Sequence, residues 1–473
     1  MKHTHLLVAI FLLLTPLAGC FDSSPVQVPD RTGGADDRNG VEGGPGVEWG
    51  PEVSDRASEW LRQNIRDEVY DQVYYHYWDL REHMEALQQD HSGIMRLSTI
   101  GRSVDGELDP FNDYGKLLLA EVTNLSDTTP KPQILIDGGH HGNEQLGMEV
   151  AMLLLDYLVT QYEEDAWVKE FVDSHDIFIF PMVNVDGNTR DTRANSNGVD
   201  LNRNYDHHWT TDETASGDGP FSEPETSNNA DYMHEWVTEA DLYVTMHTGP
   251  WILAYPWGFT PNMPSDWELF EFIRDDIHEK IDGDLPIRNA NAGIYPTHGT
   301  SRDYGYGVMG YPCFTFETDD EQFLLGSVQS VSDRLELELE VMRYLISNVW
   351  YWRARLSVDS LEVSDDHVDL SVSNIGRAST ANATVHYMNE MGEVLWHSDN
   401  FSVNASNHTD TRLDASGLSV VAGGHFELHY QKRVIDAALW VNEPVNESVV
   451  GVVSDDSWNC LPAPSLLLSM GAL

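Results

Sequence analysis

The sequence predicts an α/β fold, a mixed twisted sheet with helices on both faces, followed by a small C-terminal β-sandwich. Strand-like and helix-like segments alternate over residues 53–352, and this alternation is typical of a sheet covered by helices. Short runs of period two, separated by turn residues, follow over residues 354–450 and predict the sandwich. The length of 473 residues also exceeds what a single core usually organises, so two folded domains are expected.

The elements of the first domain are visible as apolar patterns. The helical runs are 75–87, 144–162 and 335–351, and the buried strands are 133–136, 177–180 and 242–246. In the second domain, 368–372 and 383–387 alternate between apolar and polar residues. An immunoglobulin-like and a transthyretin-like sandwich are both compatible with this pattern.

The ends of the chain predict export. Residues 1–20 contain Lys2, an apolar run and Leu17-Ala18-Gly19-Cys20, which resembles the lipobox of prokaryotic lipoproteins and marks Cys20 as the lipid anchor. Residues 21–52 are rich in Gly, Asp, Pro and Ser and predict a flexible linker. Residues 451–473 form a C-terminal tail, whose apolar part is too short to span a bilayer. We expect a protein on the outer face of the cell membrane, held by its lipid anchor, or a secreted one.

The charge balance limits the partners. Lys and Arg number 27 against 78 Asp and Glu, a formal net charge of -51. Such a chain repels polyanions, so nucleic acid is excluded as a partner. The same acidity is typical of adaptation to high salt, and ordinary solubility by charge explains it as well. The composition does not indicate an oligomeric state.

A metal site is predicted where the strand at 133–136 turns into the next helix. His141 and Glu144 stand three positions apart in a glycine-rich turn, so both can face one ion. Taken alone, the pattern is explained better by a capping Glu beside a His bonded to backbone. A catalytic zinc site needs a third protein ligand and an open position, and His247, at the end of the strand at 242–246, is the candidate.

Further motifs stand in order between and after these residues. They are Asn184-Val185-Asp186-Gly187, Arg190 to Arg193, Gly198-Val199-Asp200-Leu201-Asn202-Arg203-Asn204, Phe221-Ser222-Glu223-Pro224-Glu225-Thr226, Tyr255-Pro256-Trp257-Gly258 and Phe314-Thr315-Phe316-Glu317. Together with the His and Glu pair and the distant His, they resemble the zinc carboxypeptidase family, which includes carboxypeptidase A and the carboxypeptidase N/E branch. The resemblance covers roughly residues 75–343.

The resemblance implies a metal centre and an activity. One Zn²⁺ would be held by His141, Glu144 and His247, and Asp200 would orient His141. The implied activity is hydrolysis of the last peptide bond of peptides or proteins, with their C-termini as the binding partner.

The resemblance also assigns the residues that act on substrate. Glu317 matches the general base that takes a proton from the attacking water, and Arg193 matches the arginine that stabilises the oxyanion. Asn202, Arg203 and Tyr295 match the residues that bind the free C-terminal carboxylate.

Arg302 departs from the family pattern. Alignment of Tyr295 and Glu317 without gaps places Arg302 at the floor of the pocket for the C-terminal side chain, so a preference for Asp or Glu is expected. A structural ion pair with Asp303 is the alternative.

Two other functions remain open at the level of sequence. A zinc amidohydrolase of related fold acting on N-acyl amino acids would share the metal ligands. A non-catalytic surface binding protein would keep the scaffold.

Overall fold

The computed structural model describes residues 51–71, 73–281, 283–318, 328–364, 366–421, 423–433, 445–449 and 452–453. Cys20, the signal peptide and nearly all of the predicted linker and C-terminal tail lie outside these residues, so they stay predictions. Within the described part, no helix combines the length and the apolarity needed to cross a bilayer.

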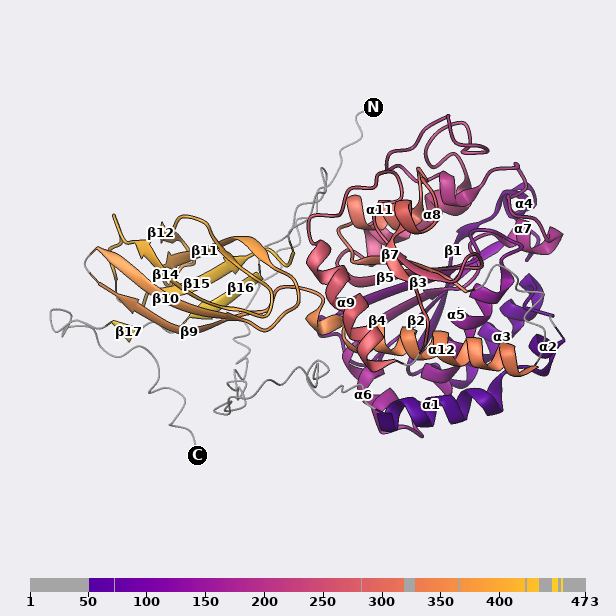
Figure 1. Cartoon of the computed structure of the whole chain (residues 1–473), viewed down its shortest axis with the longest axis horizontal. Helices are drawn as coiled ribbons and strands as arrows, with labels where there is room; N and C mark the ends of the chain where they lie inside the picture. The colour runs from indigo at the N-terminus through magenta and orange to yellow at the C-terminus, as the bar shows by residue number, and fades with distance from the viewer. Residues whose placement is uncertain are drawn as a thin grey trace, which may run out of the picture. The chain divides into compact units, whose positions relative to one another are not determined.

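An eight-stranded sheet forms the centre of the first folded part (Figure 1). Its strands are β1 (Met95–Arg102), β2 (Lys116–Val122), β3 (Gln133–Gly138), β4 (Asp176–Phe180), β5 (Ala240–His247), β6 (Ile252–Tyr255), β7 (Ile287–Asn289) and β8 (Cys313–Glu317). Their order is β1-β2-β4-β3-β5-β8-β6-β7, and the four central strands β4, β3, β5 and β8 run parallel. The pairs β1 with β2, β2 with β4 and β6 with β8 are antiparallel, so the sheet is mixed.

Helices cover both faces of this sheet (Figure 1). On one side, α5 (Gln145–Thr160) packs on β3, β4 and β5, and α1 (Pro51–Asn64) and α12 (Val328–Ser347) pack on α5. On the other side, α8 (Pro224–Trp236) contacts β1, and α11 (Ser301–Gly307) contacts β5 and β8. The remaining helices are α2 (Asp67–Tyr70), α3 (Tyr77–Asp90), α4 (Val104–Leu108), α6 (Ala166–Ser174), α7 (Val185–Arg190), η1 (Leu201–Arg203), α9 (Trp267–Lys280), α10 (Ala290–Gly293) and η2 (Val349–Tyr351).

The position of α5 is set by a glycine. Nearly all residues of α5 are buried, which its almost uninterrupted apolar sequence requires. A Cβ at Gly147 would lie 2.9 Å from the backbone oxygen of His247. The missing side chain therefore lets the first turns of α5 contact the end of β5.

The second folded part is a β-sandwich, as predicted. One sheet has the order β14-β10-β9-β17 and the other β12-β11-β15-β16, with β13 paired to β11. The strands are β9 (Leu356–Val363), β10 (His367–Asn374), β11 (Thr380–Met388), β12 (Val394–His397), β13 (Phe401–Val403), β14 (His408–Asp414), β15 (His425–Tyr430), β16 (Val445–Val449) and β17 (Val452–Val453). Buried side chains of both sheets, such as Val372 and Leu428, form one apolar core. The predicted fold class, a mixed sheet with helices on both faces and a β-sandwich, is confirmed.

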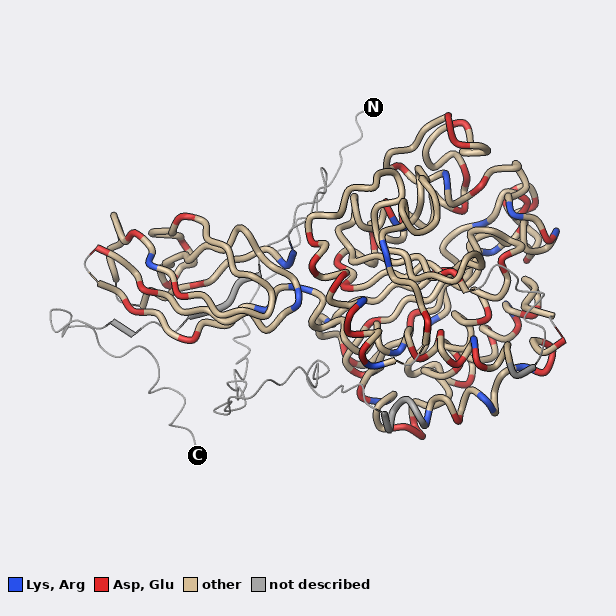
Figure 2. Tube along the Cα trace, in the orientation of Figure 1, with Lys and Arg blue, Asp and Glu red and all other residues tan. Residues whose placement is uncertain are grey.

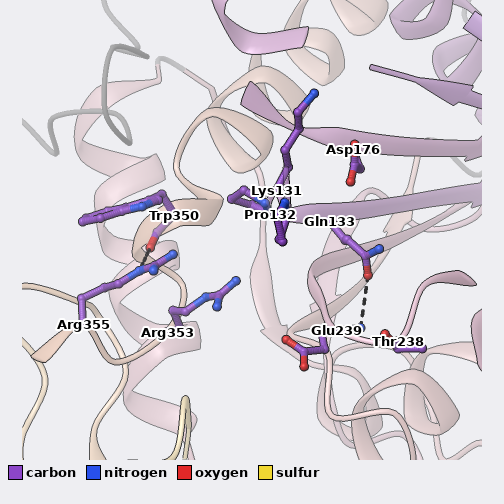
Figure 3. A pocket seen from close by; sticks show the side chains of 10 residues that line it. Lys131, Pro132, Gln133, Asp176, Thr238, Glu239, Trp350, Arg353 and Arg355 are labelled. Carbon is purple, nitrogen blue, oxygen red and sulfur yellow. Dashed lines mark hydrogen bonds between the residues drawn. The ribbon is translucent and has the colours of Figure 1, made fainter. Parts of the chain in front are cut away.

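Acidic side chains are spread over both folded parts, whereas the fewer basic ones are scattered among them (Figure 2). Several basic residues lie where β3, β4 and β5 begin. A cavity of about 500 Å³ there is lined by residues that include Arg353 and Arg355 (Figure 3). Arg355 donates from Nε to the Trp350 oxygen over 2.9 Å, and Arg353 pairs with the buried Asp241. This end of the sheet is opposite to the end discussed next.

Candidate metal centre and active site

Three parallel strands end side by side and present polar side chains there. The turn after β3 carries His141 and Glu144, β5 ends at His247 and β8 ends at Glu317. His247 and Glu317 are direct register partners on β5 and β8. Carboxyl ends of parallel strands are the usual place for sites in α/β sheets, and this sheet follows that rule.

His141, Glu144 and His247 form a compact donor set. Their ligand atoms all lie within 4.8 Å of one another. Glu144 Oε1 is 2.7 Å from His141 Nδ1 and Oε2 is 2.9 Å from His247 Nδ1, and the two Nδ1 atoms are 3.3 Å apart. The two imidazoles are buried, at 3% and 1% exposure. Although burial opposes it, the two imidazoles hold the pKa of Glu144 below its usual range.

Asp200 fixes the orientation of the first imidazole. His141 donates from Nε2 to Asp200 Oδ1 over 2.9 Å, which leaves the Nδ1 lone pair directed at Glu144 and His247. Asp200 also accepts from the backbone N of Asn202 and from Arg193 Nε. Two imidazole nitrogens and one carboxylate oxygen, with a carboxylate behind one His, are a donor set that suits a zinc ion with one position left for water or substrate. The residues present therefore fit one Zn²⁺.

Most of the predicted site residues line one cavity of about 250 Å³, and Asp200 and His247 are not part of its lining. Its lining comprises His141, Glu144, Arg193, Asn202, Arg203, Thr248, Gly249, Pro250, Ala290, Ile294, Tyr295, Thr297, Thr300, Arg302, Thr315 and Glu317. His247 lies directly behind this lining. The larger cavity of Figure 3 is elsewhere and holds none of these residues.

Glu317 and Arg193 face the donor set from two sides. Burial first, and the charge of Glu144 second, raise the pKa of Glu317 to about 8. A divalent cation beside it would oppose both effects. Gly249 leaves room for this carboxylate, since a Cβ there would lie 2.4 Å from Glu317 Oε2. Arg193 Nη1 donates to Glu144 Oε1 over 2.9 Å, so its guanidinium borders the donor set.

The three residues expected to bind a carboxylate lie close together. Arg203 is 7% exposed, and its Nη2 is 3.5 Å from the hydroxyl of Tyr295, which is half-exposed. Asn202 lines the same cavity, but its amide is already engaged. Its Oδ1 accepts from Ser301 N over 2.9 Å and its Nδ2 lies 3.2 Å from His247 Nε2.

Arg302 lies in the cavity wall and is 3% exposed. It donates from Nε to Asp303 Oδ1 and from Nη1 to Thr315 Oγ1, over 2.9 and 3.1 Å. The expected ion pair with Asp303 is therefore present. Nη2 is buried and has no acceptor among the described residues. A Cβ at Gly258 would lie 2.2 Å from this Nη2, so the glycine leaves room for the guanidinium.

Several cavity residues were not predicted from sequence. Thr315 stands two positions before Glu317 on β8, and the period of two in a strand could have placed both on one face. Thr297 in the lining, and Glu213, which lies outside the lining and pairs with Arg203, have no such signal, because loops carry them. His140, the neighbour of His141, is buried, and its Nε2 forms a hydrogen bond of 2.8 Å with the Tyr205 hydroxyl.

Comparison with known proteins finds similarity to zinc carboxypeptidases in both sequence and fold. The family model described as zinc carboxypeptidase matches residues 80–334. Carboxypeptidase B from Astacus astacus is 26% identical over 278 residues, which are 52% of this chain and 86% of that protein. Carboxypeptidase B from Rattus norvegicus is 27% identical over 277 residues, 53% of this chain and 64% of that protein. The crystal structure of carboxypeptidase A from Helicoverpa armigera aligns with a TM-score of 0.51 at 17% identity, over 63% of this chain and 80% of that one, and shares the fold.

Proposed function

Because the chain belongs to the zinc carboxypeptidase family, we propose that it is a metal-dependent exopeptidase that releases single residues from the C-termini of peptides. The observation that carries the proposal is one cavity that joins a zinc-type donor set to a buried arginine, Arg203, and to Glu317. A guanidinium in this place suits the free carboxylate of a peptide end. An internal peptide bond offers no such group, which is why the activity is assigned to chain ends.

The residues around the donor set have distinct tasks in this reaction. Zinc, when bound, supplies a Lewis acid that polarises the scissile carbonyl and makes water more acidic. Glu317 accepts a proton from the attacking water and returns it to the leaving amine. Arg193 donates to the oxyanion that develops on the carbonyl oxygen. Arg203 and Tyr295 hold the substrate carboxylate, and this fixes which bond is cut.

Acidic C-terminal residues are the proposed preference. The support is Arg302, a buried guanidinium in the cavity wall whose Nη2 lacks an acceptor among the described residues. A buried donor without a partner costs free energy, and a substrate side chain with a carboxylate removes that cost. Asp303 neutralises part of the charge, but it also accepts from the backbone N of Gly258 over 2.8 Å. An apolar side chain would leave Nη2 unpaired, so it is disfavoured.

Export with a lipid anchor is proposed on the sequence alone. Leu17-Ala18-Gly19-Cys20 supplies the residue that would carry the lipid. A Cys20→Ser variant is expected to leave the membrane fraction, and a variant that stays there would contradict the anchor.

A C-terminal release assay tests the catalytic proposal. Chelation of the metal is expected to abolish release, and added Zn²⁺ to restore it. Glu317→Gln is expected to lower turnover by about 10²-fold or more while the zinc content stays unchanged. Glu239→Gln, at the other end of the sheet, is the matched control and should retain full activity. A fully active Glu317→Gln protein would refute the mechanism.

A further inference from the structure

The Arg203 guanidinium is engaged on each of its three nitrogens. Nη1 donates to the Asn202 carbonyl oxygen over 2.8 Å, and Nη2 lies 3.5 Å from the Tyr295 hydroxyl. The third nitrogen, Nε, lies 3.6 Å from Glu213 Oε2. Glu213 thus forms an ion pair with this guanidinium, and the Arg203 side chain is only 8% exposed.

Glu213 is held firmly in this place. Its Oε1 accepts from the His298 backbone N over 3.1 Å and from His298 Nδ1 over 2.9 Å. The loop that carries Glu213 is tied to the base of the site, because Ala215 O accepts from Asp200 N over 2.8 Å. Glu213 therefore sits between Arg203 and the segment that carries Tyr295, and both of these are assigned to the substrate carboxylate.

This placement has an electrostatic consequence for anything that binds Arg203. A buried guanidinium without a counter-charge is costly, and Glu213 removes that cost in the free enzyme. The same carboxylate repels a second carboxylate that arrives at the Nη side. Its side chain is 22% exposed, so solvent screens the repulsion only in part.

We propose that Glu213 is a counter-charge that weakens the hold of Arg203 on the C-terminal carboxylate and so allows the released amino acid to leave. The inference rests on the proposed function, since it assigns Arg203 to that carboxylate. Glu213 acts through Arg203 and does not touch the reacting bond, so it is a positioning residue. After hydrolysis the released amino acid still carries its α-carboxylate. Each turnover therefore ends only when this carboxylate dissociates from Arg203.

Calorimetric titration of the zinc-loaded full chain with L-glutamate, without turnover, tests this. Glu213→Gln is expected to bind L-glutamate roughly tenfold more tightly, because the like charge is gone and Arg203 lacks its partner. The α-amide of glutamate has no α-carboxylate, so its affinity should not change. The variant should also melt at a lower temperature without ligand and recover with L-glutamate, because the ligand then compensates Arg203.

Two control variants distinguish the negative charge of Glu213 from its contact with Arg203. Asp212→Asn removes one negative charge from the exposed neighbouring position and is expected to bind like the unmodified enzyme. Glu213→Asp keeps the charge and should shift affinity less than Glu213→Gln, and it serves as the test should the glutamine variant not fold. Under steady-state turnover, product inhibition by L-glutamate should strengthen in Glu213→Gln in parallel.

The outcomes are distinct. Equal or weaker binding of L-glutamate by Glu213→Gln, with normal binding by the unmodified enzyme, would overturn the role of Glu213 and leave the peptidase intact. Failure of the unmodified zinc-loaded enzyme both to bind L-glutamate and to release any C-terminal residue would remove both proposals.

Discussion

His141 and Asp200 are joined by a 2.9 Å hydrogen bond from Nε2 to Oδ1, so one carboxylate selects the imidazole tautomer that can bind metal. Asp200→Asn is expected to weaken zinc binding by roughly 10- to 100-fold, because the amide no longer stabilises the N–H at Nε2. Competition with a chelator of known affinity measures this change. Asp206→Asn, an exposed acid nearby, should leave zinc affinity unchanged.

Arg302→Gln tests the proposed acidic preference. Replacing the guanidinium by an amide removes the charge, so the ratio of kcat/KM for peptides ending in Glu to those ending in Leu is expected to fall by roughly tenfold or more. Arg96→Gln, on β1, serves as the control for loss of one positive charge. Faster release of Leu or Lys than of Glu by the unmodified enzyme would defeat the preference.

Gly147→Ala is expected to disturb the metal centre through the contact between α5 and the end of β5. Its Cβ would lie 2.9 Å from the His247 backbone oxygen, so α5 or the end of β5 must shift. We expect a loss of roughly 1–3 kcal/mol in stability, together with weaker zinc binding. Denaturant unfolding and chelator competition report the two effects. Gly219→Ala adds the same methyl group in open space and should change neither.

The buried carboxyl of Glu149 on α5 is expected to make the stability of the protein depend on pH. Burial raises its pKa from 4.5 to about 7, against the opposing effect of Arg66. Because the folded-state pKa is the higher one, this carboxyl contributes stability below about pH 4.5 that is lost as pH rises through about 7. Glu149→Gln cannot titrate, so the stability of the unmodified protein relative to the variant should fall by up to about 3 kcal/mol over that window. Denaturant unfolding of both proteins at several pH values measures it, and parallel pH profiles would contradict the assignment.

Much of the fold could be predicted because its elements are long and periodic. The run at 144–162 is apolar nearly throughout and forms α5, and the strand at 242–246 lies within β5. The helix expected from residue 75 begins at Tyr77, because His76 has an extended backbone and serves as its N-cap. Propensity alone does not fix such a boundary.

The metal donors could be predicted because each stands at the end of an apolar strand or in the turn that follows it, and Glu317 was predicted through the resemblance to the zinc carboxypeptidase family. Residues brought in by loops could not. Glu213 lies in a long loop that contacts Arg203, and Thr297, which lines the cavity, lies in the segment after Tyr295. Loops show no periodic pattern of apolar residues, so the sequence does not predict which residues they contact. The sequence predicts Arg302 at the floor of the pocket. It does not show that Nη2 lacks an acceptor, because this depends on how the chain packs around Gly258.

The pairing of His247 with Glu317 across β5 and β8 has a wider consequence. Backbone pairing of the two strands holds Glu317, the proposed proton acceptor, beside His247, whatever the intervening chain does. Tyr295 and Arg302, which are proposed to contact the substrate, belong to the chain segment between those two strands. Substitutions in that segment can thus change which substrate side chain is bound, while the sheet keeps His247 and Glu317 in place.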